Sequence, residues 1–407
     1  MNGFEWLESL REQGMNLGLE NTRELLSRLG NPHNNFPSIH VAGSNGKGTT
    51  CSILANTFVL NGIKTGLFTS PHLCNVEERI RIDGIQISRS ELRSNLEKLQ
   101  FVCKIKPQII PTYYEATFII AMIYFSSLNV ERAIIETGLG GRLDATRLVN
   151  ADCCILTQIS LEHTEILGNS LSEIAYEKSA IARKGIPLIS KWNDNDDVRD
   201  IIEKSVTSSE LIEWYKPVNK QNIIEEATGL ANLALLKMQI PLDCNDGAKV
   251  TFWPGRMQRI NYSKELEILL DCAHNTSGIS RALDEISLNY KGVKNIVFGC
   301  TKQNNLSMFL QPLIHFIKKE DIETLILTEP QGGRTKAVSI IELVKILSLS
   351  LPGINFIEEP NPNVAISRAI SITKKGILLS IGSLYLIGNI LKSLGLDDSN
   401  SMKIFRK

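Results

Sequence analysis

The feature of this sequence that most constrains its fold is an alternation of short apolar, β-branched segments with longer amphipathic segments of helical length. In the first half, the short segments are 38–42, 65–68, 132–136, 153–158 and 186–189. From about residue 258 the pattern starts again, with short segments at 266–270, 295–298, 323–327, 354–356 and 377–380. Strands that alternate with helices form parallel sheets covered by those helices. The sequence therefore predicts an α/β protein with mostly parallel sheets.

The length and the restart of the pattern indicate two domains. A chain of 407 residues exceeds the roughly 100 to 200 residues that one domain usually contains. A turn signal, Trp253-Pro254-Gly255, precedes the second series of strands. We therefore expect one domain over 1–257 and a second, smaller open-sheet domain over 258–407.

One early helix has clear boundary signals. Asn21 or Thr22 can cap its N-terminus, and Gly30 with Pro32 can end it. Leu25, Leu26 and Leu29 then line one side of the helix.

Composition excludes several classes of protein. Lys+Arg 44 against Asp+Glu 44 gives no net charge and hence no basic surface for nucleic acid. Apolar runs such as 118–123 are far shorter than the ~20 residues of a membrane span, and the N-terminus carries acids where a secretory leader would be basic. The eight cysteines form no C-x-x-C pair, which is typical of reduced, buried thiols. We expect a globular cytoplasmic protein without membrane or nucleic-acid partners.

The strongest chemical signal is a glycine-rich loop between a predicted strand and a predicted helix, His40-Val41-Ala42-Gly43-Ser44-Asn45-Gly46-Lys47-Gly48-Thr49-Thr50. Glycines let backbone N–H groups surround phosphate oxygens at a helix N-terminus, a lysine reaches the β- and γ-phosphates, and a hydroxyl can bind Mg²⁺. The loop departs from G-x-x-x-x-G-K-[ST], since Val41 replaces the first glycine and Gly48 separates Lys47 from Thr49. A plain glycine-rich turn is the alternative, but the lysine followed by hydroxyls favours phosphate binding.

A second group of polar residues follows three predicted strands of the first half. These are Ser70, Glu136 and the pair Glu162-His163. Because open α/β sheets bind ligands at the carboxyl ends of their strands, these side chains are expected to converge. Taken singly, Ser70 could belong to a turn, Glu136 could be an exposed strand end, and His163 could be a hydrogen-bonded loop residue. Together with the glycine-rich loop they favour a Mg²⁺ site of oxygen ligands with one imidazole.

Lys178 lies in an amphipathic segment, 172–181. From composition alone it is interpreted as a solvated helix lysine.

A series of ordered motifs resembles the folylpolyglutamate synthase and dihydrofolate synthase family, relatives of the muramyl ligases, and it covers nearly the whole chain. The motifs are Gly18-Leu19-Glu20, Leu29-Gly30-Asn31-Pro32, the glycine-rich loop, Ser70-Pro71-His72-Leu73, Glu78-Arg79, Thr112-Tyr113-Tyr114-Glu115, 136–144, 163–168, Glu177-Lys178, Pro254-Gly255-Arg256, 271–275 and Gly382-Ser383-Leu384.

The resemblance implies an N-terminal P-loop NTPase-like domain and a C-terminal Rossmann-like glutamate-ligase domain that close over the reactants. It implies an ATP-dependent amide ligase that adds L-glutamate to dihydropteroate and, through the γ-carboxyl, to reduced folates. The acceptor carboxylate would take the γ-phosphoryl group of ATP, and the amine of glutamate would attack the resulting acyl phosphate. The glycine-rich loop and Mg²⁺ would neutralise the negative charge that accumulates while the phosphoryl group is transferred.

The resemblance also implies roles for individual residues. The triphosphate loop would be Ser44, Asn45, Gly46, Lys47, Gly48 and Thr49, and further nucleotide contacts would be Asn232, Arg256, Asp271 and His274. The metal ligands would be Thr49, Ser70, Glu136, His163 and Lys178, with Lys47, Lys178 and His163 as catalytic residues. The pterin-side pocket would be Thr112, Tyr113, Tyr114, Glu115, Leu143, Asp144 and Ala145. Lys178 matches a carbamylated lysine, which requires a buried, neutral amine and would serve a second Mg²⁺. The resemblance leaves room for K⁺, and we expect a monomer.

Some positions depart from the family pattern. Glu162 stands where aspartate is usual, Cys272 where a small residue is usual and Thr276 where proline is usual. Gln303-Asn304-Asn305 replaces an Asp-Lys-Asp segment, and Lys302 is more simply a solvated loop lysine. Gly332-Gly333-Arg334 matches a basic loop, with a plain turn as the alternative.

Three other functions stay open at this point. They are a single-activity folylpolyglutamate synthase, another carboxylate ligase of the muramyl type, and a nucleotide switch that hydrolyses ATP without forming an amide.

Overall fold

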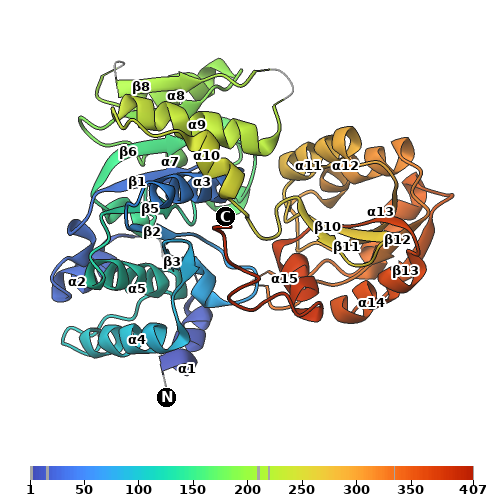
Figure 1. Cartoon of the computed structure of the whole chain (residues 1–407), viewed down its shortest axis with the longest axis horizontal. Helices are drawn as coiled ribbons and strands as arrows, with labels where there is room; N and C mark the ends of the chain where they lie inside the picture. The colour runs from blue at the N-terminus through green and yellow to red at the C-terminus, as the bar shows by residue number, and fades with distance from the viewer. Residues whose placement is uncertain (1–2, 15–17, 209–210, 219–220, 334, 407) are drawn as a thin grey trace. The chain divides into compact units, whose positions relative to one another are not determined.

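The computed structural model divides the chain into two compact units (Figure 1). The structure describes residues 3–14, 18–208, 211–218, 221–333 and 335–406. Unit 1 comprises 1–72, 76–252 and 403–407, and unit 2 comprises 73–75 and 253–402. Each unit contains its own sheet, which confirms the predicted α/β fold.

Unit 1 is built on an eight-stranded sheet of order β4-β3-β2-β5-β1-β6-β7-β8. Its strands are β1 (Ser38–Ala42), β2 (Thr65–Phe68), β3 (Ile80–Ile82), β4 (Ile85–Gln86), β5 (Arg132–Glu136), β6 (Ala151–Leu156), β7 (Leu188–Lys191) and β8 (Ile212–Tyr215). Strands β2, β5, β1, β6, β7 and β8 run parallel, whereas β3 and β4 add an antiparallel edge. The carboxyl ends of the parallel strands therefore share one edge of the sheet.

Helices cover this sheet. They are α1 (Gly3–Ser9), α2 (Glu20–Arg28), α3 (Lys47–Leu60), α4 (Arg89–Cys103), α5 (Tyr113–Ser127), α6 (Thr164–Leu167), α7 (Leu171–Ser179), α8 (Asp196–Lys204), α9 (Ile223–Lys237) and α10 (Cys244–Val250), with short 3₁₀ turns η1 (Leu10–Gln13), η2 (Pro32–Asn34), η3 (Val76–Arg79) and η4 (Ala145–Leu148). Helix α3 packs on β1, β2 and β5 and against α9 and α10. Helix α5 contains the apolar run 118–123 and is buried in the core. Among the described residues, no helix has both the length and the apolar character to cross a membrane.

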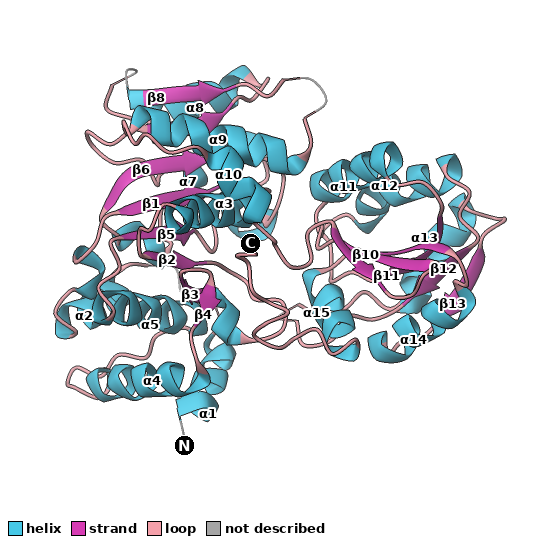
Figure 2. Cartoon of the chain, in the orientation of Figure 1, coloured by secondary structure: helices cyan, strands magenta, loops and turns pink. Residues whose placement is uncertain are grey.

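Unit 2 contains a six-stranded sheet of order β13-β12-β11-β14-β10-β9. Its elements are β9 (Gln258–Asn261), β10 (Leu266–Leu270), α11 (Thr276–Asn289), β11 (Val293–Phe298), α12 (Leu306–Lys319), β12 (Thr324–Leu327), α13 (Ile340–Ser350), β13 (Asn355–Glu358), α14 (Pro362–Ile372), β14 (Gly376–Ile381) and α15 (Leu384–Ser393). Along β10, Leu269 joins a core with α11 and α12, whereas Ile268 and Leu270 join a core with α14 and α15. Successive side chains of a strand point to opposite faces, so the sheet lies between two helical layers (Figure 2).

The sequence-based boundaries differ from the structure, and residues 73–75, expected in the first domain, belong to unit 2. The units separate between 252 and 253, a few residues before the expected 257/258, and the last residues, expected in the second domain, belong to unit 1. They pair there because Phe252 donates its N–H to Ile404 and Arg406 donates to Val250. The predicted cap of the early helix was wrong: this helix, α2, begins at Glu20, and Leu19 at its N-cap makes no side-chain capping bond.

Candidate active site

The glycine-rich loop forms a turn between β1 and α3. Gly46 has φ +88 at the N-cap of α3, and Gly43 has φ +140, where a Cβ would collide with the Thr157 side chain. Ser44 donates from its hydroxyl to the Ser160 carbonyl at 3.1 Å and accepts from the Ser160 N–H at 3.0 Å. The first N–H groups of α3 thus open onto a loop held against the chain that follows β6, as phosphate binding at a helix N-terminus requires.

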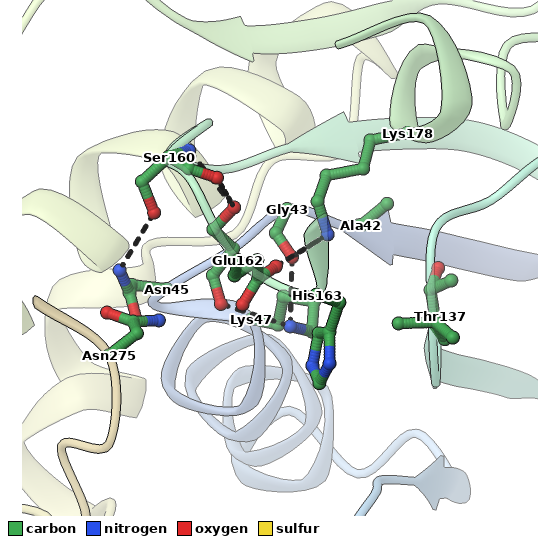
Figure 3. A network of polar contacts seen from close by, with 12 residues as sticks. Ala42, Gly43, Asn45, Lys47, Thr137, Ser160, Glu162, His163, Lys178 and Asn275 are labelled. Atoms are coloured by element: carbon green, nitrogen blue, oxygen red, sulfur yellow. Dashed lines mark hydrogen bonds and ion pairs between the residues drawn. The ribbon is translucent and has the colours of Figure 1, made fainter. Parts of the chain in front are cut away.

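Two lysines, the half-buried Lys47 and the buried Lys178, meet at one carbonyl of this loop. Lys47 donates from Nζ to the Gly43 and Ser44 carbonyl oxygens at 2.9 and 3.2 Å. Lys178, on α7, donates to the same Gly43 oxygen at 3.0 Å (Figure 3). The structure overturns the interpretation of Lys178 as a solvated lysine, because the residue is 2% exposed.

Glu162 is the counter-ion of this pair. Its Oε1 lies 2.7 Å from Lys178 Nζ, and the two side chains are 7% and 3% exposed. Burial opposes ionisation of Glu162, but Lys178 and Lys47 outweigh it and lower its pKa to about 2. Burial lowers the pKa of Lys178, and Glu162 partly opposes that shift. The cluster thus contains two lysines and one ionised carboxylate at the phosphate loop.

Two of the expected metal ligands lie together. The Ser70 N–H donates to Glu136 Oε2 at 3.0 Å, and Glu136 is buried at the end of β5. Thr49 is buried in the first turn of α3. An oxygen-rich set of this kind fits a hard divalent cation.

His163 lies on the lysine side. It has φ +46 at the N-cap of α6, and its side chain is 47% exposed. Partial burial lowers its pKa, Lys178 and Lys47 add to that effect, and Glu162 opposes it. In the described part of the chain, no three or more His, Cys, Asp and Glu side chains are grouped to hold a metal ion. The expected ligand set includes the hydroxyl groups of Thr49 and Ser70, which such a group of His, Cys, Asp and Glu side chains would not contain. It therefore stays a prediction.

In the segment expected to bind the pterin, Thr112 and Glu115 form hydrogen bonds that hold the structure of unit 1. They form a capping box at the start of α5, with the Thr112 N–H 2.8 Å from Glu115 Oε2 and the Glu115 N–H 3.2 Å from Thr112 Oγ1. Glu115 Oε1 also accepts from the buried hydroxyl of Thr22 at 2.7 Å. These polar atoms fix the start of α5 against α2, which positions the two tyrosines between them.

The two tyrosines have different environments. Tyr113 is buried, with the Arg11 guanidinium 4.5 Å from its ring centroid. Tyr114 is half-buried and donates from its hydroxyl to Asp144 Oδ1 at 2.9 Å. Asp144 is buried between the half-buried Leu143 and the buried Ala145. The structure therefore brings 112–115 and 143–145 together, as expected.

The expected nucleotide contacts outside the loop fall in both units. Asn232, on α9 of unit 1, accepts from the Cys244 N–H at 2.8 Å. In unit 2, Asp271 accepts from the Met257 and Ala273 N–H groups at 3.0 and 2.8 Å, and Arg256 opposes the rise in its pKa that burial causes. His274 Nδ1 lies 2.9 Å from the Cys272 carbonyl oxygen, so Nδ1 carries the proton. Arg256, Asp271 and His274 thus belong to two loops of unit 2 that are hydrogen-bonded together.

The segment that departs from the family pattern has a local structural role. Gln303 donates from its amide to the Thr301 and His274 carbonyl oxygens at 3.1 and 3.4 Å. Asn305 caps α12 by accepting from the Met308 N–H at 2.9 Å. In the nearby basic loop, Arg334 lies outside the described residues.

Sequence reasoning missed two residues of this region. Glu162 was grouped with His163 among the polar residues after the strands and was noted as a departure from aspartate. Its pairing with Lys178 was not predicted, because it depends on the distance between a loop and helix α7. His40 was noted only as the start of the glycine-rich segment, although a histidine inside an otherwise apolar strand is an unusual buried polar residue.

Comparisons with known proteins agree on one family. A model described as "Mur ligase, glutamate ligase domain" matches residues 255–384. The chain is 31% identical to dihydrofolate synthetase of Saccharomyces cerevisiae, over 92% of this chain and 97% of the yeast protein. It is 32% identical to dihydrofolate synthase/folylpolyglutamate synthase of Buchnera aphidicola from Acyrthosiphon pisum, over 68% and 72% of the two chains.

Among solved structures, the chain is similar in fold to a bifunctional folylpolyglutamate synthase/dihydrofolate synthase from Yersinia pestis complexed with AMPPNP and a Mn ion. The TM-score is 0.82 at 23% identity, with 97% of this chain and 98% of that chain covered.

Proposed function

The chain belongs to the dihydrofolate synthase/folylpolyglutamate synthase family, and on this basis we propose that it joins L-glutamate to dihydropteroate and to reduced folates with ATP. The reaction is an ATP-dependent ligation that forms an amide bond. The observation that carries the proposal is the pair of lysines at the Gly43 carbonyl, placed where a triphosphate would meet the start of α3.

The reaction brings anions together. A carboxylate oxygen of the acceptor attacks the γ-phosphorus of ATP, ADP leaves, and an acyl phosphate forms. The neutral amine of glutamate then attacks the acyl carbon, a tetrahedral intermediate collapses, and phosphate leaves with its P–O bond intact. In the first step the main barrier is electrostatic, because the carboxylate approaches a phosphorus surrounded by negative oxygens. In the second step the attacking amine is neutral, and the proton that it loses leaves with phosphate.

The residues of the loop supply the opposite charge. Lys47 is held within hydrogen-bond distance of its own loop, so a small rotation of its side chain can carry Nζ to the phosphates. The N–H groups at the start of α3 add the positive end of the helix dipole. A preorganised set of this kind stabilises the transferring phosphoryl group without reorganisation during the reaction.

We propose that a divalent cation, Mg²⁺, is bound by Thr49, Ser70, Glu136 and His163. When bound, such an ion neutralises charge on the β- and γ-phosphate oxygens. The Ser70 N–H orients Glu136 by donating to one carboxylate oxygen. That hydrogen bond would fix the orientation in which the carboxylate meets the cation.

For Lys178 we propose reversible carbamylation. The amine is buried, and burial lowers its pKa, which favours the neutral form that reacts with CO₂. Addition would replace a cation by an oxygen-bearing anion next to the phosphate loop, and a second Mg²⁺ would balance it. Native mass spectrometry should detect the added mass of one CO₂. Stimulation by K⁺ stays a prediction that a titration of activity with K⁺ tests.

The acceptor side of the proposal places the pterin portion at Tyr114, Asp144 and the residues around them. Asn232, Arg256, Asp271 and His274 stay proposed nucleotide contacts. We further propose a cytoplasmic monomer. All eight cysteines are buried and none forms a disulfide, in keeping with a reducing compartment.

The decisive experiment is an acceptor panel. Purified protein with ATP, Mg²⁺ and L-glutamate should release phosphate when given dihydropteroate, and also when given tetrahydrofolate, with the glutamylated product identified by mass spectrometry. No release with either acceptor would overturn the proposal.

The same panel separates the alternatives. Release with tetrahydrofolate alone would indicate a single-activity folylpolyglutamate synthase, and release with dihydropteroate alone a single-activity dihydrofolate synthase. Equal ATP turnover with and without acceptor would indicate a nucleotide switch.

A further inference from the structure

A buried histidine that the proposed reaction does not use lies on the strand leading to the phosphate loop. His40 is in the middle of β1, is fully buried, and faces polar groups from three loops. Its Nε2 lies 2.8 Å from Thr146 Oγ1 and 3.1 Å from Thr137 Oγ1, and its Nδ1 lies 3.3 Å from Arg183 Nη1.

The arginine fixes the tautomer of this histidine. A guanidinium group can only donate, so His40 Nδ1 must be the acceptor and Nε2 must carry the proton. Arg183 is itself held by the Arg147 and Val149 carbonyl oxygens at 2.9 and 3.2 Å. Burial, Arg183 and Arg147 all lower the pKa of His40, which keeps the ring neutral.

The tautomer also sets the direction of the hydrogen bonds that continue from His40 through the two threonines. A threonine hydroxyl that accepts from Nε2–H is free to donate its own proton. Thr146 donates to Asp144 Oδ1 at 2.5 Å, whereas Thr137 donates to the Val41 carbonyl oxygen at 3.0 Å. His40 is therefore hydrogen-bonded to two threonines, and only the path through Thr146 continues to Asp144.

Asp144 joins these hydrogen bonds to the residues proposed to bind the acceptor. Its Oδ2 accepts from the Gly138 and Leu139 N–H groups at 3.0 and 2.9 Å, and its Oδ1 accepts from the Tyr114 hydroxyl. Gly138 packs directly on the Tyr114 ring, where a Cβ would collide. One carboxylate thus orients both Tyr114 and the backbone turn that follows Glu136.

We propose that His40, with Arg183 behind it and Thr146 in front, is a positioning residue that holds Asp144, Tyr114 and the 138–139 turn in the geometry needed to bind the acceptor. His40 does not touch the substrate itself. The link to acceptor binding rests on the proposed function, whereas the link to the 138–139 turn does not.

The first test needs no substrate. Thr146→Val removes the hydroxyl but nearly keeps the volume, and it should accelerate amide hydrogen exchange at Gly138 and Leu139 roughly five- to tenfold. Thr146→Ser restores the hydroxyl and should return exchange to the wild-type rate. Thr137→Val is the matched control, because it removes a hydroxyl from the same Nε2 on the branch that does not reach Asp144. Unchanged exchange in Thr146→Val, or equal acceleration in Thr137→Val, would overturn the proposal.

The second test uses the spectrum of the histidine. Long-range ¹⁵N–¹H correlation of the imidazole should show His40 as the neutral Nε2–H tautomer throughout the range in which an exposed histidine titrates. A ring protonated at Nδ1 would contradict the direction of the relay.

The third test measures ligation. Thr146→Val should raise the KM for the acceptor roughly five- to tenfold and leave the KM for ATP unchanged, whereas Thr146→Ser and Thr137→Val should resemble wild type. Equal increases in both KM values would indicate general loosening and count against positioning. If wild-type protein ligates no acceptor, the proposed function fails, and the exchange experiment together with the imidazole spectrum still decides whether the line from His40 through Thr146 holds the turn.

Discussion

Lys178 Nζ and Glu162 Oε1 are 2.7 Å apart in a place where both side chains are almost fully buried, next to the phosphate loop. A buried ion pair is tolerated when its geometry is good and its other hydrogen-bonding positions are filled. Here the Gly43 carbonyl takes a second hydrogen of the ammonium group. The pair therefore links α7 to the loop that would bind ATP.

Glu162→Gln should lower the free energy of unfolding at neutral pH by about 3 kcal/mol, because it leaves the buried Lys178 without its counter-ion. Urea denaturation followed by circular dichroism measures this value. Asp246→Asn breaks the exposed pair Lys249–Asp246 and serves as the control, with little change expected. A Glu162→Gln protein as stable as wild type would contradict the assigned pairing.

The same pair predicts how stability depends on acid. The pKa of Glu162 falls from 4.5 in the unfolded chain to about 2 in the folded protein, so its contribution is present above 4.5 and is lost as pH falls towards 2. Wild type should therefore lose about 3 kcal/mol more than Glu162→Gln across that window, at about 1.4 kcal/mol per unit of pKa. Parallel stability curves for the two proteins between these pH values would exclude the depressed pKa.

Lys47→Ala should reduce ATP turnover at least 100-fold, on the order expected when a principal donor to the transferring phosphoryl group is lost, while the fold stays intact. Phosphate release measures the activity, and thermal unfolding checks the fold. Lys98→Ala changes an exposed lysine of α4 and should behave as wild type. Normal turnover in Lys47→Ala would remove the assignment of the phosphate loop.

Lys178→Ala should also lose activity, and short carboxylic acids should restore part of it if a carbamate normally supplies oxygen ligands at this position. Activity is measured with and without added acetate or propionate. The comparison protein is Lys178→Arg, which keeps the charge but cannot be carbamylated. Full activity of Lys178→Arg would rule out the carbamate.

Ile404→Ala should destabilise unit 1 by about 3 kcal/mol, because Ile404 is fully buried and its truncation leaves a cavity. The segment is also held by Asn56, which donates to the Ile404 carbonyl at 3.0 Å. Urea denaturation measures the free energy of unfolding of Ile404→Ala. Lys403→Ala, which changes a half-buried neighbour, is the control that separates the effect of the buried side chain. Equal stabilities would show that the C-terminal residues do not belong to this core.

The central parallel strands could be predicted because they are buried on both faces. Strands such as 38–42 and 132–136 are short, largely apolar segments that contain β-branched residues, and the structure reproduces both ranges. The edge strands β3, β4 and β9 were not predicted. They are short and antiparallel, and their pairing depends on neighbours that are distant in sequence.

Helix ends show the same limit. Thr22 has the right chemistry for a cap, yet it lies inside α2, where its hydroxyl donates to Glu115. Local propensity allowed the cap, and a contact between two helices decided otherwise.

The amino-acid order alone therefore determined the alternation of strands and helices, the glycine loop with its lysine, and the family pattern, since these depend on periodicity and on residues that are neighbours in the chain. Only the tertiary structure decided that Lys178 is buried against Glu162 and that His40 is linked through Thr146 to Asp144. The energies of such groups depend on desolvation and on distances of a few ångströms between separate loops, and neither is encoded in local spacing.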